Sequence, residues 1–417
     1  MDEIPRDQVQ EFVADEFVVA TPYLDLVMGR LGDSRAEIKA QDPELGLTLI
    51  RLINVDEAAG HVRSEREAIA ARPITTRGAV DERIPLDRLL IDLRTRFAHE
   101  YGGWIPPMGK NRVMLGVQLF PYPQAGGDDA PVPLPADTQL PRYAPDGRIG
   151  DGARVVVLDT AIYTNDRLAG TYLAAPDSLL RDTTEVRDWW AGHGTFVTGL
   201  IVQRAPAAQI EIGSVLDVDG GTADVWTVAG RLIRCANTGA DVVNLSFGCF
   251  TVDGEPPLVL ERAITRVSAG SVVVAAAGNY GKLTGDKPPT STTPIWPAAF
   301  DNVVAVGATD GAGQSAPFTP TVPWLDLLAP GVNVESTYLK GRVLGPPDKT
   351  TKQRDKQEFD GMARWSGTSF AAATVSGAIA AGVVPGRRTA YEALELLRSG
   401  TAGDSGTGIE VAKLPVH

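Results

Sequence analysis

Five apolar runs between residues 153 and 308 restrict the fold of the chain more than any other feature of its sequence. Each run is rich in valine, isoleucine, leucine or alanine, is not broken by regular polar alternation, and ends at a polar residue or a glycine turn. Continuous β-branched runs are typical of strands that are buried on both faces, as in a parallel sheet covered by helices. The five runs are 153–159, 208–217, 241–246, 270–278 and 302–308.

Helix-like segments lie between these runs, for example at 223–238 and 257–269. Alternating strands and helices predict an α/β domain with a mostly parallel, buried sheet and helices on both of its faces. In such folds, ligands and chemistry gather at the carboxyl ends of the strands. Functional residues are therefore expected directly after the apolar runs.

The N-terminal part of the chain has a different pattern. Segments 15–20 and 45–55 are expected to be strands, with a helical stretch between them. A further helix is expected to begin near Pro85, because proline suits a first helical turn. These elements predict a smaller α+β domain ahead of the α/β domain. The residues on one face of the further helix are Leu86, Leu89, Leu90, Leu93 and Phe97.

A stretch rich in proline, glycine and aspartate separates the two parts. Residues 121–151 show neither helical nor strand periodicity, and this composition is typical of a linker. The sequence therefore predicts three parts: an N-terminal α+β domain at 1–120, a linker at 121–151, and an α/β domain at 152–417.

The charge balance excludes some classes of partner. The 417 residues carry a net charge of −13, whereas nucleic-acid binding needs a basic surface, so no nucleic-acid partner is expected. No apolar run reaches the roughly 18 residues that a membrane-spanning helix needs, and no membrane partner is expected. The first twenty residues hold six acidic side chains and one arginine, unlike a signal peptide. With only two cysteines, the chain is expected to be cytoplasmic and to lack a disulfide framework.

Two polar residues with catalytic potential follow strand and turn signals. Asp159 ends the run 153–159, where a carboxylate either caps the structure or faces the active end of the sheet. His193 lies between two glycines in "AGHGTFVTG", just before a helical pattern. It is either a buried histidine at a helix start or a catalytic base, since flanking glycines let partners approach closely.

Two more such residues come later in the chain. Asn279 follows the run 270–278 and is either a turn residue or a side-chain donor. Ser369 lies in "RWSGTSFAAATVSG", where it either starts a helix or is a nucleophile beside unpaired helix N–H groups. Taken jointly and in this order, Asp159, His193, Asn279 and Ser369 supply the orienter, base, oxyanion donor and nucleophile of acyl transfer.

This order of motifs resembles the subtilisin-like serine protease (subtilase) family. Four segments match in sequence: "VVLDTAI", "GHGTFVTG", "AAAGN" and "GTSFAAATVSG". The resemblance implies that Asp159 orients His193, that His193 is general base and acid, and that Ser369 is the nucleophile. It further implies that Asn279 binds the oxyanion together with the N–H of Ser369.

The resemblance also implies further features of the site. "NLSFG" matches a segment that lines the primary specificity pocket, here Ser246, Phe247 and Gly248. The family's calcium-binding loop is missing, because 200–213 runs almost directly into the next strand. No cofactor is expected, and no metal is expected at this loop, while a calcium site elsewhere in the chain stays open. Two long stretches, 280–295 and 338–363, are expected to be surface insertions that border the pocket and the catalytic rim.

Two functions are open at this point. The first is a serine endopeptidase that cleaves polypeptide substrates through an acyl-enzyme intermediate. In this case we expect region 1–120 to act as an inhibitory prodomain, and the chain to be a zymogen activated by cleavage in the linker. The alternative is a catalytically silent module that keeps the subtilase fold to bind a peptide or a partner protein.

Overall fold

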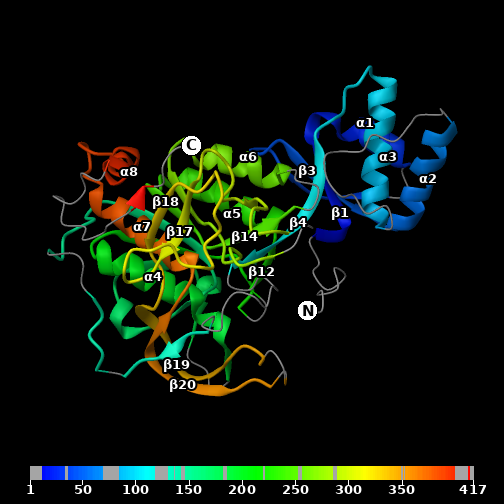
Figure 1. Cartoon of the computed structure of the whole chain (residues 1–417). Coiled ribbons are helices and arrows are strands. Elements are labelled where there is room, and N and C mark those ends of the chain that lie inside the picture. Colours follow the sequence, from blue (N-terminus) through cyan, green and yellow to red (C-terminus); the bar gives the residue numbers. More distant parts are fainter. Residues whose placement is uncertain are drawn as a thin grey trace. The chain divides into compact units, whose positions relative to one another are not determined.

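A computed structural model gives the fold of the chain (Figure 1). The predicted linker 121–151 falls only partly within the residues that the structure describes. The structure describes residues 12–32, 36–68, 84–117, 130–135, 137–141, 146–181, 186–218, 221–251, 256–284, 289–348, 351, 353–399 and 412–413.

The chain forms two compact units. Unit 1 comprises Met1–Met114 with two short later segments, Asp224–Gly230 and Cys249–Ala263. Unit 2 comprises the remainder: Leu115–Ala223, Arg231–Gly248 and Ile264–His417.

Unit 1 is an α+β domain, as the sequence predicts. Its strands follow the order β4-β1-β3-β2, and each neighbouring pair is antiparallel. In Figure 1 the three helices lie together on one side of these strands. The elements are β1 (Phe12–Ala20), α1 (Leu24–Leu31), β2 (Ala36–Asp42), β3 (Leu47–Leu52), α2 (Val55–Ala68), α3 (Pro85–Glu100) and β4 (Met108–Gly116).

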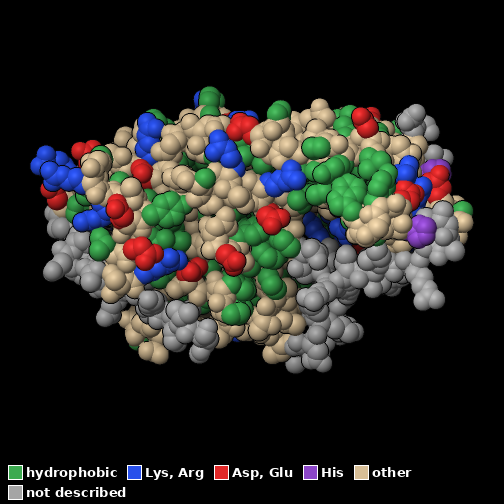
Figure 2. All heavy atoms as spheres, turned by 90° about the horizontal axis from the view of Figure 1, so that it is seen from above, with side chains coloured by type: hydrophobic (Ala, Val, Ile, Leu, Met, Phe, Trp, Pro, Cys, Tyr) green, Lys and Arg blue, Asp and Glu red, His purple; other side chains and the backbone are tan. Residues whose placement is uncertain are grey.

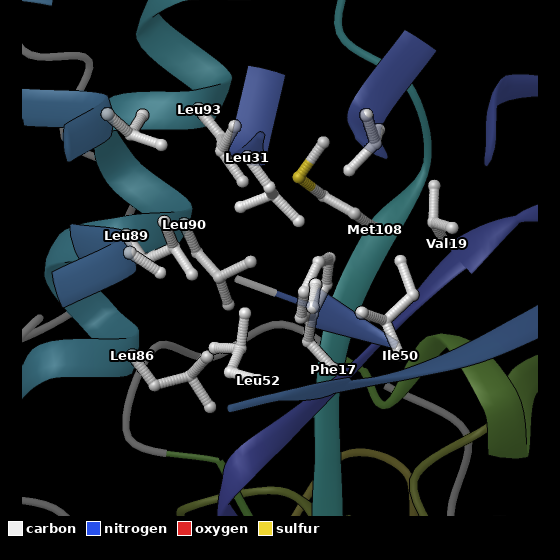
Figure 3. Packing of buried hydrophobic residues seen from close by; sticks show 14 of the residues in the cluster. Phe17, Val19, Leu31, Ile50, Leu52, Leu86, Leu89, Leu90, Leu93 and Met108 are labelled. Carbon is white, nitrogen blue, oxygen red and sulfur yellow. The ribbon is translucent and has the colours of Figure 1, made fainter. Parts of the chain in front are cut away.

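One apolar core holds unit 1 together. Phe17 and Ile50 from the strands face Leu89 and Leu93 from α3, and all four side chains have no exposed surface (Figure 3). The helix begins with Pro85 in its first turn, as expected for a residue that has no N–H to leave unpaired. Burial of this apolar surface supplies the main driving force for folding of the unit.

The prediction that one strand covers residues 45–55 is wrong at its C-terminal end. Strand β3 ends at Leu52, and α2 begins at Val55. The reason is a helix cap, because the side-chain oxygen of Asn54 accepts a hydrogen bond from the N–H of Glu57 at 3.1 Å. This cap satisfies one of the first N–H groups of α2. The chain therefore changes from strand to helix within the apolar segment 45–55.

Unit 2 contains the predicted parallel sheet. Seven of its strands are parallel in the order β18-β17-β15-β13-β6-β11-β8, and β21 adds one antiparallel strand at the edge. Each of the five predicted runs overlaps one of these strands. The strands are β6 (Arg154–Asp159), β8 (Tyr172–Ala174), β11 (Gln209–Ser214), β13 (Val242–Leu245), β15 (Val272–Ala276), β17 (Val304–Thr309), β18 (Leu327–Pro330) and β21 (Ala412–Lys413).

Strand β6 is the point at which the order of the sheet reverses. From β6 the chain passes to β11 on one side, and from β11 it passes to β13 on the other side of β6. A crevice forms at the carboxyl ends of the strands around such a point. Asp159 is the last residue of β6, so the fold places it at this crevice.

Five α-helices among the described residues begin after strand β6. Among them, α4 and α7 contact each other and both contact the sheet strand β6. Helix α7 contains residues with small side chains and is buried along nearly its whole length. The helices are α4 (His193–Arg204), α5 (Val225–Thr238), α6 (Leu258–Val267), α7 (Thr368–Gly382) and α8 (Ala390–Ser399).

A long β-ribbon forms most of the expected surface insertion 338–363. Strands β19 (Val334–Leu344) and β20 (Lys356–Trp365) pair antiparallel (Figure 1). The ribbon is anchored because Tyr338, Phe359 and Trp365 are buried. The insertion is therefore paired rather than a loop, although several of its side chains, among them Lys356, Gln357 and Glu358, are exposed.

Short strands complete the described part of the chain. They are β5 (Val132–Pro133), β7 (Ile162–Tyr163), β9 (Leu179–Leu180), β10 (Arg187–Asp188), β12 (Thr222–Asp224), β14 (Phe247–Phe250) and β16 (Ile295–Trp296).

The surface carries charges of both signs. On the face shown in Figure 2, basic and acidic side chains are interspersed. Among the described residues, none of the helices has the length and apolar character that crossing a bilayer requires.

Candidate active site

Asp159 and His193 form a buried hydrogen-bonded pair. Nδ1 of His193 lies 2.8 Å from Oδ1 and 3.0 Å from Oδ2 of Asp159. Both side chains have no exposed surface. An ionised carboxylate can only accept hydrogen bonds, so this pairing places the ring hydrogen on Nδ1 and leaves Nε2 as the acceptor nitrogen.

Neighbouring backbone groups hold this pair in place. The N–H of Thr160 donates to Oδ1 of Asp159 at 2.7 Å, and the N–H of Gly194 donates to the hydroxyl of Thr160 at 2.9 Å. A Cβ at Gly194 would lie 2.5 Å from the carbonyl oxygen of Thr160. Glycine is therefore needed after His193 so that the start of α4 can approach the end of β6.

Ser369 is the second residue of α7. Its hydroxyl and Nε2 of His193 are both buried, and neither has a hydrogen-bond partner among the described residues. Hydrogen bonds between catalytic groups often tighten only when a substrate binds. The N–H of Ser369 belongs to the first turn of α7, where a helix offers no intrahelical acceptor.

Thr368 connects Asn279 to the start of α7. Oδ1 of Asn279 accepts hydrogen bonds from the N–H of Thr368 at 2.9 Å and from its hydroxyl at 3.0 Å. These contacts fix which end of the amide is oxygen, because only an oxygen can accept two such donors. The NH₂ group of Asn279 is consequently the end turned away from Thr368.

The predicted pocket residues lie beside Ser369. The hydroxyl of Ser246 is 3.5 Å from the carbonyl oxygen of Ser369. A Cβ at Gly248 would lie 2.6 Å from Cγ1 of Ile295, so the segment leaves no room for a side chain there. Phe247 is fully buried in the same strand, β14.

Aromatic rings surround His193, and sequence reasoning missed them. The ring of Trp190 stacks on the imidazole with centroids 4.2 Å apart and planes at 23°. Trp365 meets it edge-on at 5.5 Å, and Phe370 lies at 5.6 Å. The available signal was the pair of tryptophans three and four residues before His193, but nothing in the sequence pattern shows that one of them stacks on the imidazole.

The structure thus brings all seven predicted residues into one region of unit 2. Asp159 and Asn279 follow β6 and β15, and His193 and Ser369 begin α4 and α7. The described part of the chain contains no cluster of three or more His, Cys, Asp or Glu side chains able to hold a metal ion. The chemistry open to this arrangement is proton transfer and nucleophilic attack by a hydroxyl group.

Comparison with known sequences identifies the family. The chain matches the model of the Subtilase family over residues 150–383. It is 35% identical to subtilisin BL of Lederbergia lenta over 213 residues, which cover 48% of this chain and 71% of that protein. It is 33% identical to a thermophilic serine proteinase of Bacillus sp. (strain AK1) over 215 residues, which cover 47% of this chain and 50% of that protein.

A solved structure shares the fold over most of the chain. The crystal structure of fervidolysin from Fervidobacterium pennivorans, a keratinolytic enzyme related to subtilisin, matches with a TM-score of 0.58 at 17% identity. The match covers 94% of this chain and 58% of fervidolysin. At this identity the likeness shows the fold alone. Together with the family match, these similarities show that the chain belongs to the subtilase family and is a subtilisin-like serine protease.

Proposed function

We propose that the chain is a serine endopeptidase that uses Asp159, His193 and Ser369 as a catalytic triad. The observation that carries the proposal is the buried pair of Asp159 and Nδ1 of His193 at 2.8 Å. This pair leaves Nε2 able to take a proton. Ser369, at the start of the neighbouring helix α7, offers a hydroxyl without a partner among the described residues.

The proposed reaction begins at the hydroxyl oxygen of Ser369. This oxygen attacks the carbonyl carbon of a peptide bond while its proton passes to Nε2 of His193. The negative charge that develops on the carbonyl oxygen is held by the NH₂ group of Asn279 and the N–H of Ser369. His193 then gives the proton to the leaving amine, and water releases the acyl group from Ser369. Asp159 stabilises the charged imidazole throughout.

Cleavage of an unfolded protein tests this proposal. Wild-type chain is expected to cut casein internally, and Ser369→Ala is expected to abolish cutting. Ser399→Ala removes an exposed hydroxyl at the end of α8 and serves as the matched control, which is expected to cut at the wild-type rate. Undiminished cutting by Ser369→Ala would contradict the proposal, and a folded chain that stays inert after the linker is cut would favour a module that only binds.

We further propose that the N-terminal domain restrains the protease until the linker is cut. The proposal is supported by the position of Leu115–Val117, which directly follow unit 1 in the chain and run along the pocket residues of unit 2. Leu115 and Gly116 pair antiparallel with Gly248 and Phe247. A peptide segment in this position competes with substrate for the same backbone groups.

Controlled cleavage tests this restraint. A recognition sequence for a specific protease is introduced at 124–129, within the predicted linker, and the chain is cut there. Casein hydrolysis is expected to rise after cutting as the N-terminal part dissociates. An equal rate before and after removal of residues 1–120 would contradict the restraint without affecting the proposed catalytic roles.

A further inference from the structure

Residues Leu115–Val117, which belong to unit 2, form an extended segment between two other stretches of that unit. On one side, Leu115 and Gly116 pair antiparallel with strand β14, and the N–H of Val117 donates to the carbonyl oxygen of Ser246 at 3.3 Å. On the other side, the N–H of Gly116 donates to the carbonyl oxygen of Gly221 at 3.0 Å. These contacts involve only main-chain groups, so another peptide could make them equally well.

The segment runs toward the proposed nucleophile. Its first residue pairs with Gly248, and its last bonds to Ser246, whose hydroxyl lies 3.5 Å from the carbonyl oxygen of Ser369. A substrate in the same register would therefore present the peptide bond after its third residue to Ser369. The following inference rests on the proposed function, because it concerns which peptides reach that serine.

Gly116, in the middle of the segment, has no room for a side chain. A Cβ at this residue would lie 2.1 Å from Cζ2 and 2.2 Å from Cη2 of Trp190. Gly116 is not among the glycines with positive φ, so its backbone conformation is open to any residue. The restriction is therefore steric, and it comes from one side chain.

Trp190 has little freedom to withdraw from this contact. Its side chain is 1% exposed. The indole stacks on His193 at 4.2 Å and meets the ring of Trp189 edge-on at 5.9 Å. A shift that made room beside Gly116 would have to disturb the imidazole that takes the proton from Ser369.

We propose that Trp190 is a specificity-determining residue that admits only glycine at the substrate position equivalent to Gly116. Peptides are then selected by the absence of a side chain at the second residue before the bond that is cut. The same indole stacks on the imidazole of His193 and fills the space beside the glycine position. Substrate selection and the placement of the general base therefore depend on one side chain.

Two quenched fluorescent peptides test the proposal with the full-length chain. One copies residues 112–121, RVMLGVQLFP, and the other has alanine in place of the glycine. The glycine peptide is expected to have a kcat/KM about 10- to 100-fold higher, the range for forcing an extra methyl group into a packed site. Because both peptides compete with the same internal segment, its occupancy cancels from the ratio. A third peptide with alanine for the leucine controls for a change at the neighbouring position.

The variant Trp190→Phe provides the matched change in the protein. Phenylalanine keeps a ring over His193 but lacks the indole atoms nearest to Gly116, so the preference for glycine is expected to shrink by about tenfold. Product masses are expected to place the cut after the valine. Equal turnover of the glycine and alanine peptides, or an unchanged preference in Trp190→Phe, would overturn the proposal while leaving the protease function intact.

If neither peptide is cut, protection of Ser369 from a fluorophosphonate ranks their binding. Better protection by the glycine peptide supports the proposal, and equal protection overturns it. Absence of any labelling at Ser369 even after the linker is cut removes the proposed function, and this inference with it.

Discussion

At the scale of single residues, the start of α7 combines a nucleophile with the means to orient an oxyanion donor. Thr368 fixes the amide of Asn279 through two hydrogen bonds, and its hydroxyl also accepts the N–H of Gly278 at 3.1 Å. Ser369 follows directly. One turn of helix therefore connects the proposed nucleophile and the proposed oxyanion donor.

Removal of the donor is expected to slow the chemical step. Asn279→Ala takes away one hydrogen bond to the oxyanion, and the loss in kcat is expected to match that for subtilisin's own oxyanion asparagine, about 10²- to 10³-fold. Steady-state kinetics on a peptide substrate measure kcat and KM separately. A fall in kcat with little change in KM supports the role, because the oxyanion forms only after binding. An unchanged kcat would contradict it.

Thr368 is expected to act through Asn279 as a positioning residue. Thr368→Val removes the hydroxyl that donates to Oδ1 of Asn279 and leaves the shape of the side chain nearly unchanged. It is expected to lower kcat about tenfold, in keeping with a lost buried hydrogen bond, whereas Thr368→Ser keeps the hydroxyl and is expected to retain activity. Equal kcat values for the valine and serine variants would show that the hydroxyl does not position the amide.

The residues of the site differ in how far sequence could predict them. Asp159, His193 and Ser369 could be found because each follows a strand end or helix start with a recognisable local pattern. Trp190 could not be found, because its role depends on a contact with Gly116, which lies 74 positions earlier in the chain. A contact between residues so far apart in the chain leaves no pattern in the sequence around either residue.

At the scale of elements, α4 and α7 must pack closely, because they carry His193 and Ser369 and these two side chains have to meet for proton transfer. Gly377 of α7 makes this approach possible, since a Cβ there would lie 3.1 Å from both Cα and the carbonyl oxygen of Ile201 in α4. A backbone contact of this kind cannot be relieved by turning a side chain. The distance between the proposed base and nucleophile therefore depends on this glycine.

Gly377→Ala is expected to destabilise the protein and reduce its activity. The extra methyl group is expected to cost about 1–3 kcal/mol of unfolding free energy, as for other overpacked sites. Gly230→Ala in α5 is the matched control, because nothing lies within 4 Å of a Cβ there, and it is expected to stabilise by about 0.5–1 kcal/mol. Denaturant unfolding measures both changes. A Gly377→Ala variant as stable as wild type would show that the helices can separate freely.

The strands also show which elements hydrophobic periodicity in the sequence can and cannot predict. Central strands such as β6 and β15 were predictable because each contains an uninterrupted apolar run, VVVL in β6 and VVVAA in β15. The ribbon of β19 and β20 was not, because much of its surface is polar and only a few residues, among them Tyr338 and Trp365, anchor it. Strand β2 was missed for the same reason, since most of its side chains are exposed or half-buried.

At the scale of the whole molecule, one buried thiol makes the stability of unit 2 depend on pH. Cys235 lies in α5 with 4% of its surface exposed, and burial raises the pKa of its thiol to about 12. In the unfolded chain the same thiol loses its proton near its ordinary pKa of about 8.5. Its contribution to stability is therefore complete below pH 8.5 and is lost as the pH rises from there through 12.

Alkylation of the native protein tests this burial. At pH 9, iodoacetamide is expected to leave Cys235 unmodified in the folded chain and to label it rapidly in denaturant, because the thiolate is the reactive form. Mass spectrometry of the digested protein reports the modification. Rapid labelling of Cys235 under native conditions would contradict the packing of α5.

The domain organisation of the whole chain was only partly predictable from the sequence. The α/β and α+β classes followed from the apolar patterns, and the structure confirms both. The three-part division at 120 and 151 remains a prediction. The inclusion of 224–230 and 249–263 in unit 1 could not be foreseen, because these segments lie between strands of the parallel sheet and their membership depends on tertiary contacts.

Labelling by a fluorophosphonate tests the role of Ser369 most directly, because this reagent modifies a serine only when a neighbouring base and oxyanion donors activate it. After the linker is cut, the wild-type chain is expected to gain one adduct, and peptide mapping is expected to place it on Ser369. Asp159→Asn is expected to label far more slowly, because the imidazole then holds the wrong tautomer. A folded, cut chain that gains no adduct, or an adduct that persists in Ser369→Ala, would contradict the proposed mechanism.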